Sequence, residues 1–132
     1  MVLKALQIGL YVQVALGLAR FGLPYVGVAV PDAVWTVHPL LGVTIAVTAL
    51  VVFRPGARRP ARPLLLARYA PLAPLALGIA LLLGGIRGLP AVVAHMLLGF
   101  IAVELVGKGI EAVETADTPA SEPAAPEEAR PT

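Results

Sequence analysis

Four apolar runs dominate this sequence, and each is long enough, or nearly so, to cross a lipid bilayer, which takes about 20 helical residues. They cover roughly residues 4–23, 34–53, 67–86 and 91–110. Only 14% of the residues are charged, against roughly a quarter in soluble domains. Because a chain in lipid must satisfy its own backbone hydrogen bonds, these runs predict an all-α membrane protein. We expect residues 1–114 to form one domain, a bundle of four transmembrane helices.

The connection between the second and third runs is rich in arginine. It contains Arg54, Arg58, Arg59 and Arg62, and Arg68 follows closely. By the positive-inside rule this connection faces the cytoplasm, which also places both termini there. We therefore expect an inner (plasma) membrane protein surrounded by lipid. Because the basic residues gather in one loop, the net charge of +2 does not indicate nucleic-acid binding.

The C-terminal residues 115–132 have a different composition from the rest of the chain. They are rich in proline, alanine and acidic residues and lack large apolar side chains. Such a segment buries too little apolar surface to offset the entropy of ordering it. We predict that it is a disordered acidic tail.

The two halves of the apolar region resemble each other. The segment LGLAR at 16–20 is similar to LGGIR at 83–87, and HPLLG at 38–42 is similar to HMLLG at 95–99. Each half crosses the membrane twice in the same sense. The pattern therefore predicts two parallel two-helix repeats, related by an approximate two-fold axis along the membrane normal.

The repeat places the two histidines of the chain, His38 and His95, at equivalent positions near the outer side. If their helices face each other, both imidazoles can approach one iron, as in other helix bundles. A zinc site takes three or four protein ligands, whereas a haem with two axial imidazoles takes two. Cysteine is absent, which excludes thiolate ligands. We predict haem b with His38 and His95 as metal ligands; a structural or proton-handling pair, or another metal, remains an alternative.

Glycines and arginines accompany the histidines. Four glycines are predicted to lie about one turn below the imidazoles and to make room for a flat macrocycle: Gly17, Gly42, Gly84 and Gly99. Close packing between membrane helices is the alternative role of such glycines. Two arginines end the first and third spans at the outer face: Arg20 and Arg87. We predict that they bind the haem propionates, because guanidinium matches a carboxylate; snorkelling to the membrane surface is the alternative.

On these motifs, the chain resembles one four-helix half of haem A synthase. The resemblance covers residues 10–110 and rests on LGLAR at 16–20, His38, LGG at 83–85 and AHMLL at 94–98. It implies that the two histidines hold a haem b. The catalytic half of that family carries a glutamate three residues before the histidine of its second helix, and often an arginine after it. Here these positions are Trp35 and Pro39, so the chain is closer to the cofactor-holding half and no catalytic residue is assigned.

Together these features predict a membrane b-type cytochrome with one bis-histidine haem b near the outer face. With both axial positions filled, such a haem serves electron transfer with a quinol or a respiratory-complex partner, or haem handling. Two alternatives stay open. One is a haem A synthase-like oxidoreductase acting as a homodimer, which the missing glutamate disfavours. The other is a cofactor-free structural or assembly subunit of a membrane complex.

Overall fold

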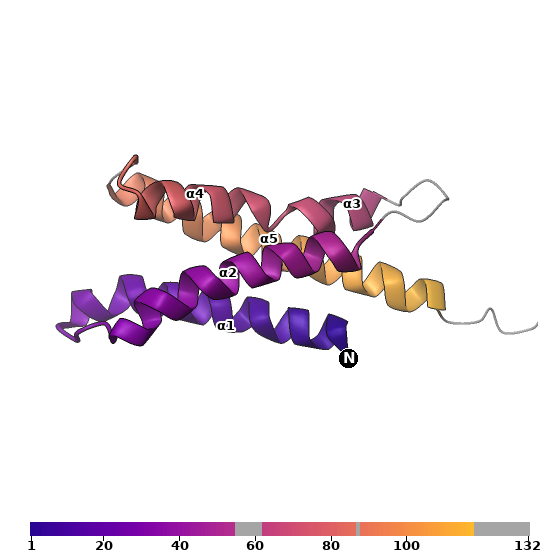
Figure 1. Ribbon diagram of the computed structural model, residues 1–132, viewed down its shortest axis with the longest axis horizontal. Helices are drawn as coiled ribbons and strands as arrows, with labels where there is room; N and C mark the ends of the chain where they lie inside the picture. The colour runs from indigo at the N-terminus through magenta and orange to yellow at the C-terminus, as the bar shows by residue number, and fades with distance from the viewer. Residues whose placement is uncertain (55–61, 87, 118–132) are drawn as a thin grey trace, which may run out of the picture.

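The computed structural model describes residues 1–54, 62–86 and 88–117, and in these residues it contains helices and no strands. A short 3-10 helix, η1 (Leu23–Val26), extends the first long helix. The bundle in Figure 1 is built from α1 (Val2–Gly22), α2 (Asp32–Val52), α3 (Arg62–Tyr69), α4 (Leu72–Leu82) and α5 (Leu89–Asp117). Four helical segments are long and apolar enough to cross a membrane: Val2–Val26, Asp32–Val52, Arg62–Leu82 and Leu89–Ala116. The predicted all-α bundle of four potential membrane spans is confirmed.

The third span lies earlier in the chain than the predicted range of 67–86. It begins at Arg62 and its helix ends at Leu82. The reason for the early end is Gly84, whose φ of 72° is left-handed. The Gly84 N–H bonds to the Leu81 carbonyl at 3.2 Å and the Gly85 N–H to the Ala80 carbonyl at 3.0 Å, which terminates the helix.

Proline divides the third span into two helices. Tyr69 is the last residue of α3, and Pro71 is the residue that precedes α4. Proline has no N–H with which to continue the hydrogen bonds of α3. The third span is therefore broken at Pro71, and Figure 1 shows α3 and α4 as separate helices. Pro74 lies inside the first turn of α4, where its missing N–H is tolerated.

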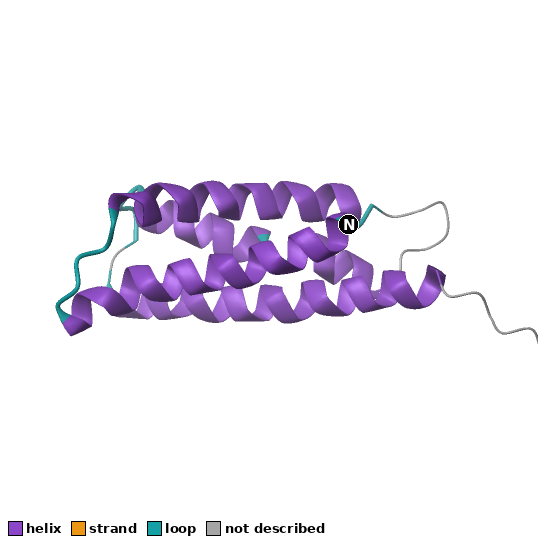
Figure 2. Ribbon diagram, turned by 90° about the horizontal axis from the view of Figure 1, so that it is seen from below, coloured by secondary structure: helices purple, strands orange, loops and turns teal. Residues whose placement is uncertain are grey.

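The order of the helices around the bundle determines which of them face each other. Helix α1 packs against α2 and α5, whereas α3 packs against α2 and α5 from the other side, as does α4. Helices α2 and α5 therefore lie diagonally across the bundle. The N-terminus, the end of α2, the start of α3 and the end of α5 lie together at one end of the molecule (Figure 1), and Figure 2 shows the long helices running side by side along the bundle. The first two spans (α1 and α2) and the last two (α3–α4 and α5) thus cross the bundle in the same sense, as the predicted parallel repeat requires.

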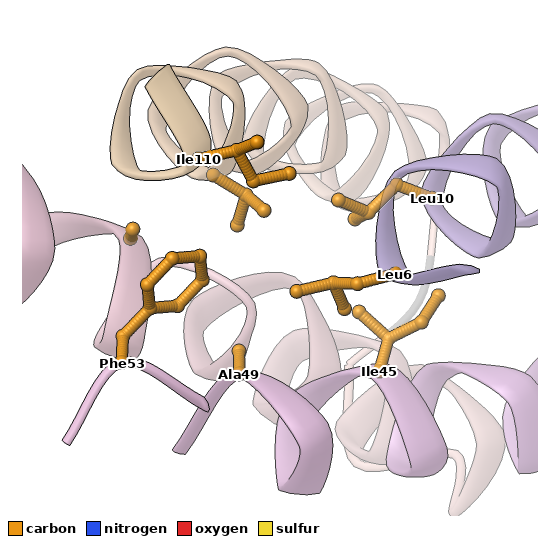
Figure 3. Packing of buried hydrophobic residues seen from close by; sticks show 8 residues of the cluster. Leu6, Leu10, Ile45, Ala49, Phe53 and Ile110 are labelled. Carbon is orange, nitrogen blue, oxygen red and sulfur yellow. The ribbon is translucent and has the colours of Figure 1, made fainter. Parts of the chain in front are cut away.

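The half of the bundle nearest the N-terminus has a well-packed core, which we call the packed half. Eight residues with at most 6% exposure form this core: Leu6, Leu10, Ile45, Ala49, Phe53, Ala67, Val106 and Ile110. Figure 3 shows the Phe53 ring and the side chains of α1, α2 and α5 filling the space between the helices. The other half, which contains the two histidines and is called the histidine half below, is packed less tightly.

Helix α5 extends further than the sequence suggested. It continues to Asp117, so the first three residues of the predicted tail, 115–117, are helical. Residues 118–132, the rest of that tail, lie outside the described residues, as do Arg58 and Arg59 of the basic connection.

Candidate functional site

The structure brings His38 and His95 together inside the histidine half. His38 lies on α2 and His95 on α5, and the centres of their rings are 6.1 Å apart, with the ring planes at 74°. His38 is buried, with 8% of its surface exposed, and His95 is half-buried. Because α2 and α5 are diagonal neighbours, the two imidazoles approach the bundle axis from opposite sides.

Each imidazole packs against a glycine of the preceding span. A Cβ atom added at Gly17 would lie 3.1 Å from Cε1 of His38, and one added at Gly78 would lie 2.9 Å from Cε1 of His95. Any larger residue at these two positions would displace the rings. The glycines therefore allow the histidine rings to lie directly against α1 and α4.

Gly78 was missed by the sequence analysis, although a signal for it exists. The segment ALGLA at 15–19 matches ALGIA at 76–80. In this alignment Gly17 corresponds to Gly78, which lies 61 residues later in the chain. The structure supports this alignment, because both glycines contact a histidine in the same way. The predicted match of LGLAR with LGGIR is therefore wrong. The separation from glycine to histidine is 38 − 17 = 21 residues in the first half and 95 − 78 = 17 in the second.

The same alignment also relates the backbone carbonyl groups of α1 and α4 that face the two imidazoles. His95 Nδ1 donates a hydrogen bond to the Pro74 carbonyl oxygen at 2.9 Å. The equivalent carbonyl on α1 belongs to Gln13, since 13 + 61 = 74, and the Gln13 backbone faces His38. However, His38 Nδ1 is buried without a well-formed hydrogen bond among the described residues. The two histidines are thus supported in similar places but with different strength.

A cavity of about 410 Å³ surrounds the histidine pair. All four spans contribute to its walls, which are mostly apolar. Polar side chains in the described part of the wall come from His38, His95, Arg20, Gln13 and Trp35. The Gln13 Oε1 atom is buried and has no hydrogen-bond partner among the described residues. A cavity of this size lies within the usual range for small-molecule and cofactor sites, roughly 300–1,000 Å³.

Arg20 lines the cavity, as expected from its position, but it already has one neighbour. Its guanidinium carbon lies 3.9 Å from the centre of the Trp35 ring. A cation stacked on an aromatic face keeps its in-plane N–H donors available for a carboxylate. Arg87, the second predicted propionate partner, lies outside the described residues. In the corrected alignment Arg20 corresponds to Leu81, since 20 + 61 = 81, so the two arginines are not equivalent.

The four predicted glycines occupy four different environments. Gly17 contacts the His38 ring, and Gly42 lies beside the Gln13 amide, whose Nε2 would be 3.0 Å from an added Cβ. Gly99 lines the cavity and has open space where a Cβ would point. Gly84 is not part of the cavity wall, because it ends α4 in a left-handed conformation. Gly78 takes the place that was predicted for Gly84.

The two imidazoles lie close enough, with 6.1 Å between the ring centres, for both to contact one ligand in the cavity. The same separation is usual for rings that pack edge to face without a ligand. Among the described residues no cluster of three or more histidine, cysteine, aspartate or glutamate side chains could hold a metal ion. The described part of the site thus offers two imidazole donors in a mostly apolar cavity.

Comparison with known proteins does not identify this chain. No family model, no curated protein sequence and no solved structure matches it.

Proposed function

We propose that this protein is a membrane b-type cytochrome that holds one haem b between His38 and His95. The observation that carries the proposal is the 6.1 Å separation of the two imidazole rings, which approach from diagonal helices within a single cavity. A haem would need no more than two ligands from the protein, and His38 and His95 could supply them. An all-protein zinc site requires a third or fourth ligand, and the cavity wall offers none among the described residues.

The residues of the chain have separate roles in this proposal. The Pro74 carbonyl fixes the tautomer of His95, so that Nδ1 carries the proton and Nε2 offers its lone pair. Gly17 and Gly78 let the two rings lie against α1 and α4. Gly42 and Gly99 provide space one helical turn from the histidines. Arg20 lies where a propionate could accept its hydrogen bonds.

When bound, a haem with two imidazole ligands supplies reversible one-electron transfer. The mostly apolar wall would limit the reorganisation that a change of charge requires. We propose a quinol or a respiratory-complex subunit as the electron-exchange partner. By the positive-inside rule, we place both termini in the cytoplasm and the histidine half near the outer face of the inner (plasma) membrane.

The test is the visible spectrum of the purified protein, produced in cells with ample haem and reduced with dithionite. We expect the sharp α band of a low-spin haem b with two imidazole ligands. This band should disappear in both His38→Ala and His95→Ala. A colourless wild-type protein with the helix content of a folded bundle would reject the proposal and favour a cofactor-free assembly subunit.

The resemblance to haem A synthase suggests a second experiment, on the enzymatic alternative. Cells that contain haem O are given the protein, and the extracted haems are analysed by mass. Because Trp35 occupies the position of the catalytic glutamate in that family, we expect no haem A. Formation of haem A above the vector control would show that the chain is an oxidoreductase.

A further inference from the structure

The two histidines differ in how firmly the protein holds them. His95 Nδ1 is bonded to the Pro74 carbonyl at 2.9 Å, which sets both its tautomer and its ring orientation. His38 Nδ1 is buried, and none of the described residues gives it a well-formed hydrogen bond. An imidazole that donates its second N–H to a carbonyl is a more basic and better oriented metal ligand. Loss of such a support typically weakens metal binding by about 10–100-fold.

The helix that carries His38 is also weakened at that residue. Pro39 follows His38 directly inside α2. Since proline has no N–H, the carbonyl of Trp35 loses its partner one turn earlier in the helix. The segment of α2 from Asp32 to His38 is therefore less firmly attached to the rest of the helix. His95 has no such neighbour, because the proline of α5 is Pro90, in the first turn, where no helical hydrogen bond is lost.

We propose that His95 is the permanent axial ligand and His38 the exchangeable one, so that a small neutral diatomic molecule binds the iron on the His38 side. This inference rests on the proposed haem site and makes it more specific. With a haem bound, His38 Nε2 would be the protein ligand that gives way to the diatomic molecule, and neither an electron nor a proton would be transferred. The cavity that contains His38 is lined mostly by apolar residues, Val14, Gly42 and Val43 among them, so a small neutral ligand can enter it without leaving a polar group unpaired.

Carbon monoxide is the probe, added at saturation to the dithionite-reduced full-length protein in detergent micelles. We expect the wild-type spectrum to change slowly to that of a carbon monoxide complex, at a rate limited by release of His38. We expect His38→Ala to keep its haem and to bind carbon monoxide at least about tenfold faster, because no ligand has to leave first. In His95→Ala, haem per polypeptide should fall about tenfold below that of His38→Ala.

Pro39→Ala is the control for the helix argument. This substitution restores an N–H that can bond to the Trp35 carbonyl and leaves both histidines in place. We expect a normal low-spin spectrum with carbon monoxide binding several-fold slower than in the wild type. Binding at an unchanged or higher rate would contradict the role assigned to Pro39.

Three results would overturn the inference itself. The first is a wild-type protein with bound haem that gives no carbon monoxide complex. The second is equal haem loss in His38→Ala and His95→Ala, with circular dichroism showing both variants folded. The third is the reverse order of haem loss. Each of these leaves the proposed cytochrome intact, whereas a colourless wild-type protein rejects the cytochrome.

Discussion

The two halves of this bundle are built from the same four helical spans, but one half is filled with side chains and the other encloses a cavity. In the packed half, side chains such as Phe53 and Val106 are almost fully buried and meet between the helices. In the histidine half, the corresponding space is a cavity of about 410 Å³ with glycines and prolines in its wall. His38 is the one buried polar residue in the part of the chain that the structure describes.

The difference shows how a membrane bundle can combine stability with a binding site. In lipid, helices associate through close packing, since lipid tails are as apolar as the side chains. The packed half supplies that packing, so the histidine half can tolerate unfilled space. A cavity left between helices forfeits the contacts of its wall, and a ligand that fills it restores them. The contrast therefore leads to different expectations for the same kind of substitution in the two halves.

The largest effect is expected for Phe53→Ala in the packed half. Phe53 is 2% exposed and belongs to the core cluster that residues of α1, α3 and α5 also form. Removal of its ring should lower the free energy of unfolding by about 3 kcal/mol, within the range for buried phenylalanine. Unfolding in mixed micelles measures this loss. The matched control is Phe100→Ala in the histidine half, where the ring is 47% exposed and the expected loss is below about 1 kcal/mol. Equal losses would contradict the distinction between the halves.

Gly109→Ala is expected to have the next largest effect. An added Cβ would overlap the Cβ of Ala67 and lie 3.2 Å from Cε1 of Phe53, so α3 and α5 would have to separate. Overpacking of this kind should cost about 2 kcal/mol in the same unfolding assay. Gly107→Ala, on the same helix, meets nothing within 4 Å and is the control. If both variants were equally stable, the close contact of α3 and α5 would be disproved.

Gly78→Ala tests the contact that holds His95. Because a Cβ at this position would lie 2.9 Å from His95 Cε1, the ring must move away from its carbonyl partner. We expect about tenfold less haem per polypeptide in the purified protein, assayed as the pyridine haemochrome. Gly17→Ala should have a smaller effect in the same direction, since its Cβ would lie 3.1 Å from His38 Cε1. Unchanged haem content in both variants would show that the two glycines do not contribute to haem binding.

Gly99→Ala should have the smallest effect on the protein itself. Its Cβ would point into open space, so we expect the free energy of unfolding of the haem-free protein to change by less than about 0.5 kcal/mol. However, Gly99 lines the cavity, and a methyl group there competes with whatever occupies it. Haem titration should therefore show a few-fold weaker affinity, whereas Gly107→Ala should match the wild type. Identical titrations for the two variants would show that the occupant does not reach Gly99.

Much of the fold follows from local features of the sequence. The four apolar runs predicted the spans, because hydropathy acts within a few residues. The break at Pro71 has an equally local cause, the missing N–H of proline. The predicted end of the third span was wrong because the prediction continued the helix through residues 83–85. These residues are as apolar as a helix interior, and the conformation of Gly84 ended the helix there.

The candidate site was only partly predictable. His38 and His95 stood out because they are the two histidines of the chain and lie in similar motifs. Gly78 and Pro74 were missed, because short apolar motifs can be aligned in more than one way. The alignment of Gly17 with Gly84 looked equivalent to that with Gly78 until the contacts with the histidine rings distinguished them.

The sequence by itself thus determined the number of spans, their approximate limits and the presence of one histidine in the second and fourth spans. The tertiary structure alone decided that α2 and α5 are diagonal, and that the two imidazoles meet 6.1 Å apart. It also decided that the Pro74 carbonyl supports His95 while His38 lacks an equal support. The physical reason is that hydropathy is a property of each helix alone. The rotation of a helix about its axis, which aims its side chains, results from the packing of all four spans together.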